Sequence, residues 1–456
     1  MDNTDLREKI KSVKAKIEKL IEQGSIDEAR AALETFEEKM PGDRDICSMR
    51  AVIHIVEGDI DKAEAILLDG LKNDSIHFDL LYNMAYIYEL RGQLQQAADF
   101  YCKAGTAVTD ASQKSSVDDA ITRLKLSDSS IQVIEKDRIV FFVKAGMDSF
   151  LGDIIQGLSD DYFVRKIVVS DFKQIDEGME WADVCWFEWC DELIGYGSRL
   201  PLAAQKKIIC RIHGYEVYSD MIKNVMWENV DQLIIVAPHI KRIFEAKIQE
   251  IFNGKIKTDL VFCGINIEKY PLMIKNEGFN LGYLGYINFK KNIPLTLDIF
   301  RKLHDSDNRY KLYIAGLFQE ERTLSYFNYF INEHGLSDSV FFDGWVEHEQ
   351  KLLWLKKIDY MVISSIDEGL CFAAAEAMCS GIKPVLHNCE GIKDHYDPSY
   401  IFSTVDQAVA MITSNQYDST EYRKFIENNF SLEKEVSQIK SLIYDLLYFK
   451  RLVKKV

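Results

Sequence analysis

The pattern of apolar and polar positions changes about 130 residues into the chain. Before that point, apolar residues recur at helical spacing, and short turns with glycine separate the helical segments. From residue 138 onwards, short runs of branched and aromatic residues alternate with amphipathic stretches. This pattern predicts an all-helical segment followed by a longer α/β region, with turns or linkers at 109–119 and 127–130.

The helical part contains an internal repeat. Three segments share one register: EQGSIDEARAAL (22–33), VEGDIDKAEAIL (56–67) and LRGQLQQAADFY (90–101). Their glycines (24, 58 and 92) and their alanines (29, 63 and 97) both recur every 34 residues. A glycine can end one helix, and a small alanine lets the next helix pack closely on it. The period resembles that of tetratricopeptide (TPR) repeats, which implies a helical repeat domain over 1–128 whose concave surface holds a peptide or protein segment.

The α/β part divides into two halves, because the alternation of strands and helices restarts after Pro271. The first half contains RIVFFV (138–143), RKIVVS (165–170), DVCWFEW (183–189), KIICRIH (207–213), QLIIVAP (232–238) and DLVFC (259–263), which we interpret as buried parallel strands. The second contains NLGYLGY (280–286), KLYIAG (311–316), SVFFDGW (339–345), DYMVISS (359–365) and KPVLH (383–387).

The alternation predicts two parallel, doubly wound sheets, that is, two Rossmann-like lobes at 135–272 and 273–435. A ligand of such sheets is expected beyond the carboxyl ends of the strands. We expect the last segment, 436–456, to be a helix that packs back across the lobes.

Two glutamates bracket the stretch EGLCFAAAE, which follows a predicted strand. Glu368 falls in the turn after the strand, and Glu376 about two turns into the next helix. The amides of Leu370, Cys371 and Phe372 open this helix and can accept an anion. Taken alone, the pattern equally fits a pair of solvent-exposed glutamates.

With this segment included, the sequence resembles the retaining GT-B glycosyltransferases of family 4 over about residues 135–435. EGLCFAAAE is similar to their E-x7-E motif, and GYLGYINFKKNIPLTLDIF (282–300) to their glycine loop followed by a basic residue. The resemblance implies that Glu368 contacts the donor hexose and Glu376 the ribose hydroxyls. It also implies that Gly285 lets the backbone approach the diphosphate and that Lys291 neutralises it.

The resemblance implies further site residues in other segments. RIHGYEVYS (211–219) is similar to a strand end with a histidine near the reacting sugar, and 313–320 and 341–365 to segments that frame the base. The expected catalytic residues are Glu368, Lys291 and His213. The expected substrate-binding residues are Glu376, Gly285, Tyr286, Lys290, Gly316, Val346, Gly369, Leu370, Cys371, Phe372, Gly146 and Glu216.

The sequence departs from the family pattern in the donor segment. Tyr286 stands where an arginine is common, so one charge contact to the diphosphate is missing unless Lys290 supplies it. Cys371 and Ala373 stand where glycine and proline are common. None of these changes removes a group that the chemistry requires.

The implied reaction needs no protein nucleophile, because retaining GT-B enzymes are thought to use front-face attack. The absence of a carboxylate pair at glycosidase spacing is therefore no objection. We expect no metal and no cofactor beyond a nucleotide-sugar co-substrate such as a UDP- or GDP-sugar, with Lys291 supplying the positive charge. DxD occurs at 43–45, 59–61 and 305–307, but these lie in repeat turns or beside a helix end.

Composition and charge restrict the partners. A net charge of −17 argues against general binding to nucleic acid or to anionic membranes. No run approaches 18 apolar residues and the N-terminus lacks an apolar signal core, so we expect a cytoplasmic protein without a transmembrane segment. The nine cysteines lie mostly in apolar segments, which favours buried thiols.

The predicted function is transfer of a sugar from a nucleotide donor to a protein or peptide acceptor that the TPR segment recruits. Residues 1–130 carry 17 basic and 25 acidic residues, which favours a basic or neutral partner. Alternatives are a lipid-linked or surface polysaccharide acceptor, a different GT-B activity such as a phosphorylase or epimerase, and a scaffold whose catalytic lobes have decayed. Tyr286 favours decay, whereas Glu368, Glu376 and Lys291 together argue against it.

Overall fold

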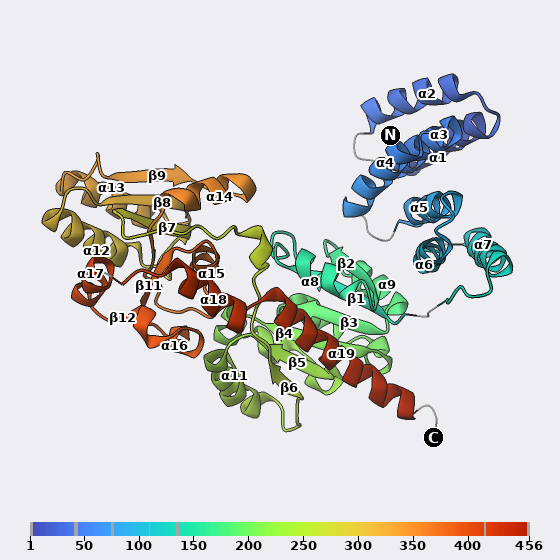
Figure 1. Ribbon diagram of the computed structural model, residues 1–456. Coiled ribbons are helices and arrows are strands. Elements are labelled where there is room, and N and C mark those ends of the chain that lie inside the picture. Colours follow the sequence, from blue (N-terminus) through green and yellow to red (C-terminus); the bar gives the residue numbers. More distant parts are fainter. Residues whose placement is uncertain are drawn as a thin grey trace. The chain divides into compact units, whose positions relative to one another are not determined.

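The computed structural model describes residues 3–40, 44–73, 77–108, 110–133, 136–414 and 416–453. The chain separates into two compact units, Met1–Asp137 and Arg138–Val456 (Figure 1). None of the helices in these ranges combines the length and the apolar composition that a membrane span requires.

Helices are the only regular secondary structure in the described residues of the first unit, which confirms the predicted repeat region. The glycines of the repeat end the first helix of each pair with φ of 76°, 82° and 73°, and the alanines of the repeat are fully buried. A side chain at such positive φ would be strained, so glycine is required at these turns. The helices are α1 (Asn3–Glu22), α2 (Ile26–Lys39), α3 (Arg44–Glu57), α4 (Ile60–Asn73), α5 (Phe78–Leu90), α6 (Leu94–Gly105) and α7 (Ala111–Ser127).

Helix α7 corrects one expectation, because the segment 109–119 was predicted to be a turn or linker. The segment is polar, but it begins with a regular helix N-cap. The Asp110 side chain accepts a hydrogen bond from the backbone N–H of Gln113 at 2.9 Å. Val117, Ala120 and Leu124 recur at helical spacing and are buried against the preceding repeat. The helix is therefore marked by its N-cap and by one buried face, although most of its residues are polar.

The second unit contains two six-stranded parallel sheets, which confirms the predicted fold class. Their strand orders are β2-β1-β3-β4-β5-β6 and β12-β11-β10-β7-β8-β9. The first sheet comprises β1 (Arg138–Val143), β2 (Phe163–Val168), β3 (Val184–Glu188), β4 (Lys207–Ile212), β5 (Gln232–Ile235) and β6 (Thr258–Leu260). The second comprises β7 (Asn280–Ile287), β8 (Lys311–Phe318), β9 (Val340–Gly344), β10 (Tyr360–Ile363), β11 (Lys383–His387) and β12 (Ile401–Phe402).

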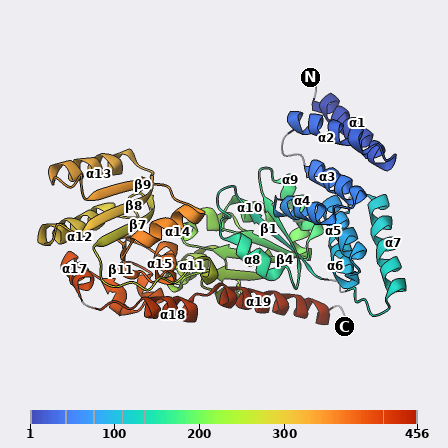
Figure 2. The same cartoon turned by 45° about the horizontal axis from the view of Figure 1, so that its top comes forward.

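Helices cover both faces of each sheet (Figures 1 and 2). The first sheet packs on α8 (Leu151–Leu158), α9 (Lys173–Trp181), α10 (Glu192–Gly197) and α11 (Pro238–Ile251). The second lobe contributes α12 (Ile293–Ser306), α13 (Glu321–Glu333), α14 (His348–Lys357), α15 (Phe372–Cys379), α16 (Ile392–His395), α17 (Val405–Thr413) and α18 (Ser419–Asn429), and the chain ends with α19 (Leu432–Val453). Short 3-10 turns are η1 (Pro201–Gln205), η2 (Tyr215–Tyr218), η3 (Met221–Asn224), η4 (Trp227–Asn229), η5 (Ile267–Lys269) and η6 (Pro398–Tyr400).

The edge strands differ from the expected buried strands. All three residues of β6 are partly exposed, and Phe341 and Phe342 of β9 are exposed. Each of these strands pairs on one side only, so it has fewer neighbours to cover it. The two-residue strand β12 was not predicted, since it is too short to show a period.

The final helix packs on the first lobe, although it follows the second lobe in sequence. Ile439, Ile443, Leu446 and Leu447 recur at helical spacing and are buried with α8 on one face of the first sheet. The helix begins at Leu432, before the expected start at 436. The side chains of its basic end, from residue 448 on, lie outside the described residues.

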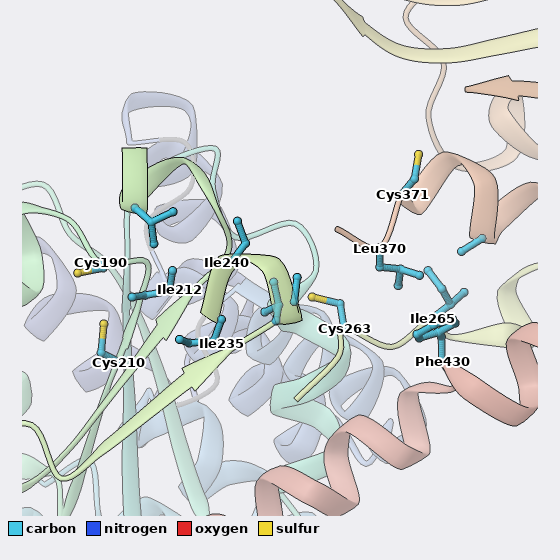
Figure 3. Packing of buried hydrophobic residues seen from close by; sticks show 14 of the residues in the cluster. Cys190, Cys210, Ile212, Ile235, Ile240, Cys263, Ile265, Leu370, Cys371 and Phe430 are labelled. Carbon is cyan, nitrogen blue, oxygen red and sulfur yellow. The ribbon is translucent and has the colours of Figure 1, made fainter. Parts of the chain in front are cut away.

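The largest apolar core continues from the first lobe into the second. Ile212, Ile235 and Ile240 belong to the same buried cluster as Leu370 and Cys371, at the start of α15 (Figure 3). The cluster anchors the loop that carries Glu368 against a packed core.

Candidate functional site

A pocket of about 270 Å³ opens at the carboxyl ends of β7 and β10 and at the start of α15. Several expected site residues line it together. The lining residues are Leu284, Gly285, Tyr286, Lys291, Ala315, Trp345, Val346, Lys351, Glu368, Leu370, Cys371, Phe372, Ala373 and Glu376. A larger hollow of about 500 Å³ lies where α18 meets α19, and none of the expected site residues lines it.

Lys291 and Glu368 form an ion pair inside this pocket. Lys291 follows the glycine loop, and its carbonyl accepts a hydrogen bond from the Ser364 hydroxyl at 2.8 Å. Burial opposes the charge of this lysine, but the attraction of Glu368 outweighs it and raises the pKa of Lys291. The ammonium group therefore stays charged, and it is held where an anionic ligand can reach it.

Glu376 is held by two groups that the sequence analysis did not name. Its Oε1 accepts hydrogen bonds from the Tyr270 hydroxyl and from Lys351 Nζ, both at 2.7 Å. Tyr270 follows η5 in the segment that joins the lobes, and Lys351 lies on α14. The pocket thus contains two lysine–carboxylate pairs.

An aromatic pair stands at the mouth of the pocket. The rings of Tyr286 and Trp345 stack with their centroids 4.8 Å apart, and both side chains remain nearly half exposed. Tyr286 stands where the resembled family commonly has arginine, so this chain offers an aromatic face there instead of a charge. A planar heterocycle can stack on such a face.

The start of α15 presents backbone amides to the pocket. Cys371 precedes the first helical residue and makes no side-chain cap. The first amides of the helix have no intrahelical acceptor, and together with the helix dipole they favour a bound anion. Leu370, Cys371 and Phe372 line the pocket at this point, together with Lys291.

Two glycines shape the neighbouring strand ends. Gly285 has φ of 132° with open space around it, so its backbone lies bare at the pocket. A Cβ on Gly316 would lie 2.0 Å from the Gly285 carbonyl oxygen. Gly316 does not line the pocket; it permits the close approach of β8 to the Gly285 loop.

Lys290 and Gly369 also lie outside the pocket lining. Lys290 Nζ is 3.6 Å from an oxygen of Asp367, and its side chain is 48% exposed. Lys290 therefore pairs with Asp367 outside the pocket, and its side chain does not join that of Lys291 in the pocket lining.

The first lobe brings His213 to the carboxyl end of β4. Its Nε2–H donates to Glu188 Oε1 at 2.5 Å, and its ring packs against Trp189 and Phe150. Gly146 follows β1 with φ of 77°, and no atom lies within 4 Å of the position that a Cβ would occupy. Neither residue lines the pocket of the second lobe.

Glu216 has a different role from the expected one. Its buried carboxylate accepts hydrogen bonds from the backbone N–H groups of Cys190, His213 and Gly214, at 3.4, 3.1 and 2.7 Å. These bonds occupy both of its oxygens. Glu216 therefore fixes the loop that carries His213, and its side chain is fully buried.

Among the described residues, Asp45, His77 and Asp79 bring potential metal-binding atoms within 4.8 Å of one another. Asp45 is already engaged, because its carboxylate lies 2.6 Å from Lys14 Nζ and 3.0 Å from His77 Nε2. A lysine in this position competes with a cation. Asp43, the other acid of the DRD segment, lies outside the described residues.

The sequence analysis missed four site residues: Lys351, Trp345, Tyr270 and Glu188. Glu188 had a detectable signal, since it is an acid inside an otherwise apolar strand. Trp345 and Lys351 lie in the segment 341–365 that was expected to frame the base, although neither was singled out there, and nothing in the local pattern distinguishes Tyr270.

Comparisons with known proteins agree with this architecture. Residues 265–429 match the family model described as glycosyl transferases group 1, and residues 20–75 match that of the tetratricopeptide repeat. Anabaena HepE in complex with UDP superposes with a TM-score of 0.56 at 13% identity, covering 68% of this chain and 100% of that one. The lipopolysaccharide outer core galactosyltransferase WaaB superposes with a TM-score of 0.53 at 15% identity, covering 68% and 99%.

Two curated relatives match parts of the sequence. A TPR repeat-containing protein of Synechococcus elongatus is 31% identical over 101 residues, which are 21% of this chain and 25% of the relative. The GDP-mannose:cellobiosyl-diphosphopolyprenol alpha-mannosyltransferase of Xanthomonas campestris is 22% identical over 213 residues, or 45% and 56%. The chain thus spans about a quarter and about half of the length of these relatives.

The two doubly wound lobes define a protein of the GT-B fold class. Within that class, the C-terminal match over residues 265–429 is a group 1 glycosyltransferase region, and the N-terminal match over residues 20–75 is a tetratricopeptide repeat.

Proposed function

We propose that this protein is a retaining hexosyltransferase that uses a nucleotide-diphosphate sugar and requires no metal ion. The observation that carries the proposal is the pocket that combines Lys291, the amides at the start of α15 and two carboxylates. A nucleotide sugar needs all three kinds of group: cation and amides for the diphosphate, and carboxylates for the sugar hydroxyls.

In the proposed reaction the bond between the sugar C1 and the diphosphate oxygen breaks, and its electron pair stays on that oxygen. The acceptor hydroxyl forms the new bond to C1 on the same face and gives its proton to the departing diphosphate. Lys291 and the helix amides stabilise the negative charge as it develops. One preorganised donor of this kind contributes roughly 3–4 kcal/mol to the transition state.

The remaining pocket residues bind and orient the donor. Glu376 accepts hydrogen bonds from the ribose hydroxyls, and Glu368 contacts the hexose. Lys351 and Tyr270 occupy Glu376 in the present structure, and they orient its carboxylate. The Tyr286–Trp345 pair offers its exposed faces to the base.

The acceptor is, in this proposal, a protein or peptide that the TPR repeats hold. Support comes from the repeats themselves, since TPR-type solenoids present extended concave binding surfaces. A lipid-linked saccharide is the second candidate. It is favoured by the similarity to the Xanthomonas campestris mannosyltransferase, which is named for a cellobiosyl-diphosphopolyprenol substrate.

The test is nucleotide release from a panel of UDP- and GDP-sugars. We expect release from at least one donor by the intact protein, and strongly reduced release by Glu376→Ala. Glu349→Ala is the matched control, because Glu349 lies exposed on α14, outside the pocket lining.

If no donor releases nucleotide and no nucleotide raises the melting temperature, the proposal is wrong and a decayed scaffold is favoured. At 100 times a plausible Kd, a bound nucleotide should stabilise the fold by about 2.7 kcal/mol. If a donor does release nucleotide, transfer assays with purified peptides and with lipid-linked saccharides distinguish the two candidate acceptors.

A further inference from the structure

Buried polar groups contact His213 at the carboxyl edge of the first sheet. Glu188 on β3 and Arg211 on β4 are fully buried and lie opposite each other in the strand register. Glu188 Oε2 accepts from Trp186 Nε1 at 2.7 Å, and Glu188 Oε1 accepts from His213 Nε2 at 2.5 Å. Both carboxylate oxygens are therefore committed, and one of them to the histidine ring.

The ring of His213 is also fixed from the sides. Its centroid lies 4.0 Å from that of Trp189 and 5.2 Å from that of Phe150. Trp189 holds a φ of 82°, and its Nε1 donates to the Met147 carbonyl at 3.1 Å. Such left-handed backbone is costly for a tryptophan and persists only where the surroundings enforce it.

The charges around His213 come from several elements. Glu188 contacts it from β3, while Arg211 lies beside both on β4 and pairs with Glu435 of α19. Cys263, after β6, accepts a hydrogen bond from Arg211 Nη2 at 3.2 Å. Glu216 is occupied by backbone amides, as described above. Glu188 is thus the carboxylate that the imidazole touches directly.

These contacts favour the charged forms of both partners. Burial disfavours an imidazolium, but contacts with Cys263 and Glu188 outweigh it and raise the pKa of His213 to about 9. Burial likewise opposes the Glu188 carboxylate, yet the attraction of Arg211 and His213 lowers its pKa. In the imidazolium both ring nitrogens carry protons, so the ring has no lone pair to act as a base.

We propose that Glu188 is a positioning residue that holds His213 as an imidazolium, so that His213 meets the donor's negative charge as a cation and does not deprotonate the acceptor. The inference rests on the proposed transferase function and deepens it. It assigns the first lobe a positive group of its own, in addition to Lys291 of the second lobe.

The first test needs no catalytic turnover. In protein with ¹³C-labelled histidine, the His213 resonance is identified among the nine histidines by its loss in His213→Asn. We expect it to titrate near pH 9 in the intact protein and at a clearly lower pH in Glu188→Gln, because only Cys263 then opposes burial and Arg211. A midpoint near 6.5 or lower in the intact protein would overturn the proposal, whether or not Glu188→Gln folds.

Saturating UDP or GDP, whichever stabilises the protein, provides the second test. A cation that faces the diphosphate should titrate at still higher pH in the complex. An unchanged His213 titration in the complex with bound nucleotide would show that the ring faces something other than the donor.

The third test uses the pH profile of kcat/KM for nucleotide release. We expect the alkaline limb of Glu188→Gln to move to lower pH, whereas the exposed control Glu192→Gln leaves it in place. An unmoved limb in a folded Glu188→Gln protein would contradict the positioning role. If the intact protein releases no nucleotide, the proposed function fails, while the titration still decides the state of His213.

Discussion

Replacing Lys291 with alanine removes the cation that the donor pocket places beside Glu368. The ammonium group has limited access to water, since 27% of the side chain is exposed, and the partner carboxylate is 7% exposed. The substitution therefore removes a charge from a poorly screened position and leaves a buried acid without its counter-ion.

The magnitude follows from this environment. Two unit charges 4 Å apart at an effective dielectric constant of about 20 interact by about 4 kcal/mol. That figure agrees with the roughly 3–4 kcal/mol that one preorganised donor contributes to an oxyanion-like transition state. We therefore expect nucleotide release by Lys291→Ala to fall by about 10²-fold or more in kcat.

The assay is steady-state nucleotide release with the donor identified above, accompanied by circular dichroism to establish folding. Lys290→Ala is the matched control, because that lysine is 48% exposed and lies 3.6 Å from Asp367. An exposed pair of this kind contributes about 0–1 kcal/mol, so the control should lose less than about fivefold. Near-normal turnover by Lys291→Ala, or an equal loss in Lys290→Ala, would refute the assignment of the charge to Lys291.

Further predictions concern binding, the repeats and stability. Gly316→Ala should destabilise the fold by about 1–3 kcal/mol in urea unfolding, because its Cβ would meet the Gly285 carbonyl at 2.0 Å; Gly152→Ala, with open space, should not, and equal effects would contradict the packing argument. Deleting residues 1–133 should leave nucleotide release intact and abolish transfer to a protein acceptor; transfer that survives would exclude recruitment by the repeats. The raised pKa of His213 should contribute up to about 3 kcal/mol of stability below pH 6.5 that is lost as pH rises through about 9. Urea unfolding of the intact protein and His213→Gln at pH 6.5 and 9.5 should therefore differ in this sense, and a constant difference would contradict it.

The repeat region shows how far the sequence alone leads. Gly24, Gly58 and Gly92 adopt positive φ, and Ala29, Ala63 and Ala97 are buried, as a 34-residue period predicts. These features could be predicted because each depends on one residue type at a fixed position in a local turn or helix. Helix α7 was missed because its polar surface resembles a linker and only its buried face reveals it.

The E-x7-E segment could be predicted only in part from the sequence. Its order of strand, loop and helix was predictable, and Glu368 and Glu376 line the same pocket. What the glutamates contact was not predictable. Lys291 pairs with Glu368 across 77 residues of sequence, and Tyr270 binds Glu376 across 106. The roles that we assign to these residues stay predictions until the variants are measured.

The fold class, the repeat and the segment that carries the donor-site carboxylates could be predicted from the residues alone, because periodicity and turn chemistry act between near neighbours along the chain. The partners of the polar groups appeared only in the packed fold: Lys351 and Tyr270 on Glu376, Glu188 on His213, and backbone amides on Glu216. The charge state and the orientation of a polar group depend on burial and on groups from other elements, and both arise only when the strands and helices pack.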